Sequence, residues 1–419
     1  MSRRCVLPLL ICAVMAGCAR EQPAVDPELA REIAGIKAID NHAHPVLAAA
    51  GDREFDALPV DSMEESSEPV ALRPDAAGTK AAAAALYAGT SKADTIRQKG
   101  DGYPAWVLDE AGIDIMLANR VAMGESVQPP RFRWVPYADA LIFPLDNSRL
   151  AMRNSDRRAF FALEDRLRAR YLGGAPLPAT LAGYTAQVVL PVLERQRQGG
   201  AVAEKFEASY LRDLSFAAVD EAAAERVYRQ YARKGVPADG EYKLLQDFLF
   251  RYIALECGRL GMAVHLHTMA GAGGYFDVAG ANPLNLEPLF DDPTLRRTKF
   301  VMVHGGWPFV EEIGALLTKP NAYLDISAQT LVLPPARIAG WLREWLAYVP
   351  EKVMFATDAY PYSAQLGWEE SAWVAARNGR EALGRALTAM LRDGEITHQR
   401  AVELARMVLR ENAKKLYGL

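Results

Sequence analysis

The chain has 419 residues, of which 50% are hydrophobic and 24% are charged, so its composition excludes an intrinsically disordered protein. A chain of this length forms either two modest domains or one enlarged α/β barrel. The 48 basic and 52 acidic side chains give a formal net charge of −4 without a dense run of lysine or arginine, and we therefore expect no nucleic-acid partner.

The start of the chain, residues 1–18, has the pattern of an export signal. Arg3 and Arg4 precede a mostly apolar run at 5–17, which is too short to span a bilayer as a stable helix. The run ends in Val-Met-Ala-Gly-Cys, which resembles a bacterial lipobox, where a peptidase cuts before the cysteine and that cysteine takes a lipid. We therefore expect an exported protein that is lipid-anchored through Cys18 in the bacterial cell envelope, on the periplasmic side. An ordinary secretory signal is the alternative.

The use of cysteine agrees with this interpretation. Cys5 and Cys12 leave with the signal and Cys18 carries the lipid, so that only Cys257 remains in the folded body. One cysteine forms no intramolecular disulfide, and stability must come from the core. Cys257 lies in an apolar helical stretch, where a buried and inert thiol is the simplest interpretation.

After a tether and a leading helix at 19–35, the body of the chain at 36–419 alternates short apolar runs with amphipathic runs, which predicts βα units. The eight candidate strands are residues 37–42, 113–119, 131–138, 201–208, 262–267, 299–304, 322–327 and 353–358. Eight parallel strands are what a closed (β/α)8 TIM barrel requires, and we predict that α/β fold. Helices are predicted at 180–197, 244–260 and 334–348, and two more at 368–392 and 397–417 close the chain.

The connection after the first strand, residues 45–114, is too long for a simple βα loop. It leaves a barrel at the carboxyl ends of the strands, where active sites are built, so a lid over the pocket is one interpretation. The alanine patch at 81–85 and the acidic cluster at 61–68 fit a loosely ordered surface insertion equally well.

Five of the six histidines fall in three short motifs, and each motif lies at the end of a predicted strand. The motifs are Asp-Asn-His-Ala-His-Pro with His42 and His44, Val-His-Leu-His-Thr with His265 and His267, and Val-His-Gly-Gly-Trp-Pro with His304. The sixth, His398, lies in a charged helix and is expected to be solvated. Scattered core histidines would have no reason to gather at strand ends.

The pair His42 and His44 suits a shared metal ion, because side chains two residues apart in a strand project from the same face. Inside a barrel that face is the lumen. Asp358 ends the eighth predicted strand, which pairs with the first strand when a barrel closes. The closed barrel would therefore bring a carboxylate beside the two imidazoles.

This ordered set of histidines and aspartate resembles the amidohydrolase superfamily of metal-dependent barrels, and within it the amidohydrolase-related branch that also holds metal-dependent decarboxylases. The resemblance covers residues 36–419. It implies that the metal ligands are His42, His44, His267 and Asp358. It also implies that His304 contacts substrate or bound water in a one-metal site, or is a ligand in a two-metal site.

The resemblance implies one divalent ion, for which we expect Zn²⁺, with Mn²⁺ or another divalent ion as alternatives. Lys205 stands where two-metal relatives carry a carboxylated lysine, but it equally suits an ion pair with an acid or contact with a substrate carboxylate. His265 shares its strand face with His267, and we favour a structural or supporting role for it over a metal bond. Arg212, Trp307 and Tyr360 follow predicted strands and are candidates for substrate contact, with loop packing as the alternative.

We predict a metal-dependent hydrolase in which a bound ion lowers the pKa of water to about 7 and the resulting hydroxide attacks an amide, ester or lactone bond of a small molecule. Asp358 would move the proton, and His304 would polarise the scissile carbonyl. A non-oxidative decarboxylase of a carboxylated small molecule is the alternative, and a non-catalytic envelope lipoprotein is a third interpretation. Assembly into a homo-oligomer is left open.

Overall fold

The computed structural model describes residues 24–47, 49, 51–52, 68–155, 157–271 and 273–419. It contains eight parallel strands in two hydrogen-bonded groups. The first group is β1 (Ala38–Ala43), β2 (Ile113–Asn119) and β3 (Phe132–Val135), and the second is β4 (Ala203–Phe206), β5 (Ala263–His267), β6 (Lys299–Val303), β7 (Ala322–Asp325) and β8 (Val353–Met354). Each predicted strand has a counterpart, and the predicted α/β barrel fold is confirmed.

Backbone contacts join the two groups at both seams of the barrel. Parallel bridges pair Trp134 with Ala201 and Tyr137 with Lys205, which joins β3 to β4. On the other side, the Asp358 N–H donates to the carbonyl of His42 at 2.8 Å, which joins the segment after β8 to β1. The strands therefore follow one another around the barrel in chain order.

The eighth strand is shorter than predicted, since it ends at Met354 rather than at residue 358. The N–H of Phe355 donates to the carbonyl of Val408, and Asp358 adopts a left-handed backbone with φ of 56°. These two features take the segment out of regular strand geometry just before it reaches the first strand.

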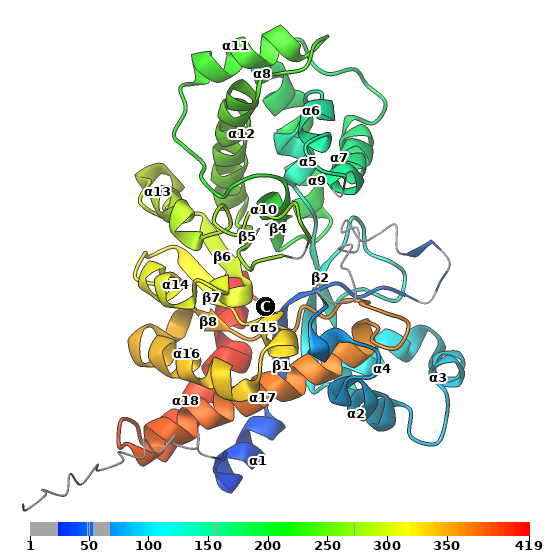
Figure 1. Cartoon of the computed structure of the whole chain (residues 1–419), viewed down its shortest axis with the longest axis vertical. Helices are drawn as coiled ribbons and strands as arrows, with labels where there is room; N and C mark the ends of the chain where they lie inside the picture. The colour runs from blue at the N-terminus through cyan, green and yellow to red at the C-terminus, as the bar shows by residue number, and fades with distance from the viewer. Residues whose placement is uncertain (1–23, 48, 50, 53–67, 156, 272) are drawn as a thin grey trace, which may run out of the picture.

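Apolar side chains fill the half of the barrel in which the strands begin. One cluster includes Ile39, Leu117 and Val301 from three different strands, and Ala413 of α19 (Asn412–Tyr417) packs into the same cluster. Side chains from strands around the ring meet only in the lumen, so α19 closes the end of the barrel where the strands begin. The C-terminal end accordingly lies near the centre of the ring of strands (Figure 1).

The connections from β3 to β4 and from β4 to β5 form a large helical lobe. The sequence analysis did not predict this lobe as a separate unit. It contains α5 (Asp139–Ile142), α6 (Ser148–Ala151), α7 (Arg157–Leu172), α8 (Leu181–Tyr184), the π-helix η4 (Thr185–Val189), α9 (Leu190–Gln198), α10 (Ala208–Leu211), α11 (Glu221–Tyr231) and α12 (Asp239–Leu260). Figure 1 shows this lobe above the strands. Cys257 is fully buried in α12, as expected for an inert thiol.

The insertion after β1 is folded in the part that the structure describes. Its elements are η2 (Val70–Leu72), α2 (Ala77–Leu86), α3 (Lys92–Lys99), η3 (Gly100–Gly102) and α4 (Tyr103–Glu110). Leu72 and Ala82 pack in one cluster with Val374 of α17 (Trp368–Arg392), and α2 lies beside α17 in Figure 1. These helices therefore flank the barrel. Most of the acidic cluster at 61–68 lies outside the described residues.

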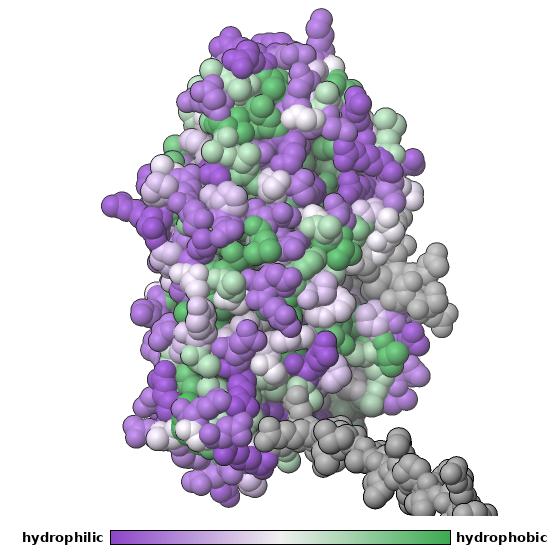
Figure 2. Space-filling view, turned by 60° about the vertical axis from the view of Figure 1, so that its left-hand side comes forward, coloured by the Kyte–Doolittle hydropathy of each residue, from purple (hydrophilic) through white to green (hydrophobic). Residues whose placement is uncertain are grey.

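The remaining elements are helical and precede, connect or follow the strands. They are α1 (Pro27–Gly35), η5 (Pro283–Leu286), α13 (Glu287–Phe290), η6 (Pro293–Leu295), η7 (His304–Gly306), α14 (Val310–Leu316), α15 (Gln329–Val332), α16 (Pro335–Tyr348), η8 (Pro350–Lys352), α18 (His398–Arg406) and the π-helix η9 (Met407–Glu411). Across the described ranges, we find no helix with the length and apolarity needed to cross a membrane. Figure 2 shows hydrophilic residues over most of one face, with hydrophobic residues in small separate patches.

Arg380 of α17 ties the beginnings of the first two strands together. Its guanidinium donates to the carbonyls of Ile36 at 3.2 Å and Gly112 at 2.7 Å. We expect Arg380→Met to reduce the free energy of unfolding by about 2–3 kcal/mol, because partly buried carbonyls lose a charged donor. Urea unfolding measures the change. The control is Arg377→Met, an exposed arginine on the same helix, and an equal loss in both variants would contradict this role for Arg380.

Candidate metal centre

The first strand delivers two imidazoles to the carboxyl end of the barrel. His42 is the last residue but one of β1, and His44 directly follows the strand. The side chains of both histidines are buried. Their Nε2 atoms lie 3.3 Å apart, and the Oδ1 atom of Asp358 is 3.2 Å from the His42 Nε2 and 3.5 Å from the His44 Nε2. The predicted meeting of the histidine pair with the carboxylate after β8 is therefore present in the fold.

His304, the first residue of η7 directly after β6, completes this cluster. Ligand-type atoms of His42, His304 and Asp358 all lie within 4.8 Å of one another. Ligands that bind one Zn²⁺ at about 2.0–2.2 Å in a tetrahedron stand roughly 3.5 Å apart, so small side-chain adjustments suffice for all three to reach a single ion. The four side chains of this group, His42, His44, His304 and Asp358, are called the metal cluster below.

Two members of the metal cluster hold an unusual backbone conformation. His304 has φ of 74° and Asp358 has φ of 56°, in the left-handed region that non-glycine residues avoid. The surrounding structure fixes them. The His304 N–H donates to Asp325 Oδ1 at 3.0 Å, and its carbonyl accepts from Gln329 Nε2 at 2.8 Å. Strain of this kind costs on the order of 1–3 kcal/mol per residue and collects at functional sites.

Each imidazole of the metal cluster has a partner on its second nitrogen. The Nδ1 atoms of His42, His44 and His304 lie 2.8–2.9 Å from Asn119 Nδ2, Tyr137 Oη and Ser327 Oγ, respectively. The hydroxyls of Tyr137 and Ser327 can accept from Nδ1–H and so leave the Nε2 atoms of His44 and His304 free for an ion, whereas the Asn119 amide donates to His42 Nδ1 and orients that ring. Sequence reasoning missed all three residues, because single uncharged side chains carry no motif. Their position at or just after the ends of β2, β3 and β7 was the only signal.

The charge state of the cluster suits a divalent cation. Burial, together with the positive charge of Lys205, lowers the pKa of His42 well below its ordinary value, and burial lowers the pKa of His304 likewise. Both rings are therefore neutral at pH 7, which is the form that binds a metal. Burial raises the pKa of Asp358. A cation beside Asp358 would favour its charged form.

Lys205 lies beside the metal cluster and is paired with an acid. Its Nζ is 2.6 Å from Glu207 Oε1 and 3.3 Å from His42 Nε2, and both Lys205 and Glu207 are buried. Although burial opposes the shift, the charge of Lys205 and the hydrogen bond with His267 lower the pKa of Glu207 to about 2. Glu207 was not predicted. Its spacing of two residues from Lys205 was a usable signal, since such residues share a strand face.

His267 stands next to the cluster with both ring nitrogens engaged. Its Nε2 is 2.8 Å from the carbonyl oxygen of Met269, and its Nδ1 is 3.3 Å from Glu207 Oε2. Its ring centroid is 4.5 Å from that of His304. We expected His304 to contact substrate in a one-metal site. The structure instead places it with His42 and Asp358 in the group whose donor atoms lie within 4.8 Å of one another. The assignment of His267 as a metal ligand stays a prediction.

The other predicted residues lie in different surroundings. His265 Nε2 is 2.7 Å from the hydroxyl of Tyr417 on α19, which fits the structural role expected of it. The Tyr360 ring is 5.6 Å from the His44 ring, so Tyr360 is at the site. Arg212 is turned to α12, where its guanidinium lies 2.5 Å from Asp247 Oδ1. The Trp307 carbonyl accepts from the Ala270 N–H at 2.8 Å, which links two loops.

Comparison with known families decides where this barrel belongs. A model of the amidohydrolase family matches residues 200–419, which is slightly more than half of the chain. The chain belongs to the amidohydrolase family. This confirms the resemblance drawn from the histidine motifs. The matched range contains His267, His304 and Asp358, whereas His42 and His44 precede it.

The protein fluG of Emericella nidulans is a curated relative of this amidohydrolase-family chain. The two are 27% identical over 222 residues, which are 50% of this chain and 25% of fluG. The match therefore spans a quarter of the length of that relative.

Solved structures share the fold of this amidohydrolase-family chain over nearly its whole length. A protein of Lactobacillus casei ATCC 334, assigned as a metal-dependent hydrolase, is 15% identical with a TM-score of 0.67, and the alignment covers 94% of this chain and 98% of that one. The uronate isomerase of Thermotoga maritima is 14% identical with a TM-score of 0.56, covering 93% and 96%. Identities this low establish the shared fold alone.

The metal cluster predicts a stoichiometry that can be measured directly. We expect purified protein to carry about one divalent ion per chain and the double variant His42→Ala with His44→Ala to lose it, because two neutral imidazole donors are removed. Inductively coupled plasma mass spectrometry after dialysis measures the metal. His398→Ala is measured in parallel, because His398 with Glu28 and Glu32 is the other group among the described residues whose donor atoms could hold an ion, and this variant should keep the ion. Retention of the ion by the double variant would exclude a metal site at this cluster.

Proposed function

We propose that this amidohydrolase-family protein is a metal-dependent hydrolase that uses a metal-activated water on an amide, ester or lactone bond of a small molecule. The observation that supports the proposal is the convergence of three imidazoles and one carboxylate at the carboxyl end of the barrel, with ligand-type atoms within 4.8 Å across His42, His304 and Asp358. An imidazole-rich set of this kind suits Zn²⁺.

A divalent ion in this site supplies a Lewis acid and lowers the pKa of water to about 7. Asp358 is the residue suited to move the proton. Its carboxylate lies at the centre of the cluster, 3.2 Å from His42 Nε2, and Tyr362 Oη lies 3.4 Å from its Oδ2. Asp358 accepts a proton from the attacking water and delivers it to the leaving group.

The buried ammonium of Lys205 beside the cluster favours negative charge on the reacting carbonyl oxygen. Its Nζ lies 3.3 Å from His42 Nε2. Positive charge and hydrogen-bond donors fixed in a buried site stabilise an oxyanion more than they would in water. Tyr360, at 5.6 Å from His44, is positioned to contact substrate.

Asp358→Asn tests the proton-transfer role. We expect kcat to fall by roughly 10²–10⁴-fold, because the amide cannot accept the proton, while the chain stays folded. The assay uses a panel of amides, esters and lactones, with metal content measured in parallel, and Asp101→Asn serves as an exposed control that should leave kcat unchanged. Unchanged kcat in Asp358→Asn would contradict the mechanism. Release of CO₂ from aromatic acids without any hydrolysis would replace the hydrolase by the decarboxylase.

We further propose that the protein is exported and anchored in the cell envelope by a lipid on Cys18. The support is the sequence pattern alone, since Cys18 lies outside the described residues. The proposal is independent of the chemistry at the metal cluster.

Cys18→Ser tests the anchor. In bacteria fed radiolabelled palmitate, the unchanged protein should carry label and sediment with membranes, whereas the variant should carry none, because serine offers no thiol for the lipid. Cys257→Ser is the control and should keep the label, since Cys257 is buried in α12. Equal labelling of the unchanged protein and the Cys18 variant would disprove lipidation at this residue.

A further inference from the structure

A small cavity of about 270 Å³ lies in the helical lobe, between α7, α10 and α12. Four cationic side chains line it: Arg153, Arg157, Arg212 and Lys243. Three carboxylates also line it, those of Asp213, Asp239 and Asp277. The volume is just below the range for drug-sized ligands and suits a single charged group.

Three of the four cations are neutralised by protein carboxylates. Arg153 forms an ion pair with Asp239. Arg212 lies 2.5 Å from Asp247, and Lys243 lies 3.2 Å from the same carboxylate. A further carboxylate, that of Asp213, lies 3.5 Å from the Lys243 Nζ. These pairs account for the positive charge of Arg153, Arg212 and Lys243 without any ligand.

Arg157 is different, because it is buried and forms no ion pair with any residue that the structure describes, although the negative charge of Asp277, which lines the same cavity, acts on it. Its exposed fraction is 8%, and its Nη2 donates to the carbonyl oxygen of Tyr275 at 3.2 Å. Its Nε is buried and has no hydrogen-bond partner, and within the described part of the chain the guanidinium forms no ion pair. A buried guanidinium without an anion loses its hydration and gains little in return. Burial also lowers the pKa of Arg157.

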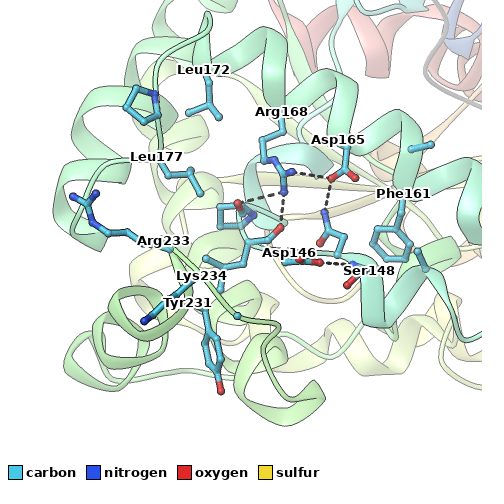
Figure 3. Close-up of a pocket in the computed structure, with 18 of the residues that line it drawn as sticks. Asp146, Ser148, Phe161, Asp165, Arg168, Leu172, Leu177, Tyr231, Arg233 and Lys234 are labelled. Carbon is cyan, nitrogen blue, oxygen red and sulfur yellow. Dashed lines mark hydrogen bonds and ion pairs between the residues drawn. The ribbon is translucent and has the colours of Figure 1, made fainter.

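Another cavity in the same lobe shows what a satisfied arginine looks like. This cavity of about 630 Å³ is lined by Arg168, which like Arg157 belongs to α7. Arg168 donates to the carbonyl of Leu145 at 2.5 Å and lies 3.1 Å from Asp165, and Figure 3 shows the contact with Asp165 as a dashed line. The protein thus supplies its own acceptors for Arg168 and leaves the Nε of Arg157 without one.

A row of aromatic rings leads from Arg157 toward the metal cluster. Tyr275, whose carbonyl accepts from Arg157, has its ring 5.6 Å from that of Phe160. Phe160 stacks on Tyr210 at 5.1 Å, and Tyr210 contacts the ring of His267 at 4.6 Å. The cavity and the metal cluster are therefore connected through packed side chains.

We propose that this cavity binds a small oxyanion, a carboxylate or a phosphate group, through the guanidinium of Arg157. The anion accepts from the guanidinium and neutralises a charge that no ion pair among the described residues compensates. The oxyanion is either a charged group of the substrate or a free anion, and the two sources have the same chemistry at Arg157.

Inorganic phosphate is the probe for the first test. Isothermal titration calorimetry on protein dialysed free of metal, at constant ionic strength set with chloride, should detect one phosphate per chain. Arg157→Gln should weaken this binding at least tenfold. Arg166→Gln removes the same charge from an exposed position on α7 and should leave it unchanged. Because the protein is free of metal, phosphate binding does not depend on the metal cluster or on the proposed hydrolase activity.

Gly240 offers a second variant that keeps the test decisive should Arg157→Gln fail to fold. Gly240 lines the cavity in the first turn of α12, and a Cβ added there meets no atom within 4 Å. Gly240→Glu brings a carboxylate to the cavity, and a negative charge in a first helical turn is favourable. It should abolish phosphate binding, whereas Gly240→Gln should retain it. No phosphate binding by the unchanged protein, or equal binding by Gly240→Glu and Gly240→Gln, would overturn the proposal.

The source of the oxyanion is then assigned kinetically, and this step alone rests on the proposed function. Competitive inhibition of hydrolysis by phosphate, with a higher KM in Arg157→Gln, assigns the site to a charged group of the substrate. Phosphate binding that leaves KM unchanged assigns it to a free anion. Both results support the oxyanion site, and they differ only in what fills it.

Discussion

The seam between the first strand and the segment after the eighth strand is the contact on which the metal cluster depends. Asp40 lies inside this seam, where its carboxylate accepts from the Thr357 N–H at 2.9 Å, from the Thr357 hydroxyl at 2.5 Å and from the His42 N–H at 3.2 Å. Three donors on one buried carboxylate fix the two segments against each other. Since His42 and Asp358 each adjoin this junction, the barrel cannot close without bringing the imidazole and the carboxylate together.

A second carboxylate, Asp325, does the same for β6 and β7. It accepts from the backbone N–H of His304 at 3.0 Å and from Asn41 Nδ2 at 2.6 Å, so that β1, β6 and β7 share one buried acceptor. The left-handed backbone of His304 persists because these bonds hold it. The strained backbone of His304 lowers the stability of the fold. It also holds the donor atoms close together in the absence of an ion.

The sequence predicted the fold and the general position of the site well, because both follow from strong periodic signals. Alternating βα runs predict eight strands. Five histidines at the ends of predicted strands indicate that the site lies at the carboxyl ends of the barrel. The finer geometry does not follow from such patterns. His304 enters the closest group of donors through a left-handed backbone, and Arg212 is drawn to Asp247 on α12. Both outcomes depend on contacts between segments far apart in the chain, which one sequence does not reveal.

The order in which the chain is made gives the seam a further consequence. Asp40 and Thr357 are separated by 317 positions, so the two sides of the seam are synthesised at very different times. The histidine pair of β1 leaves the ribosome long before the carboxylate that faces it. Until Thr357 and Asp358 follow, His42 and His44 lack both their carboxylate and the wall of the barrel behind them. The native set of metal ligands is therefore present only after nearly the whole chain has been synthesised. An ion can bind to all of these ligands only late in folding.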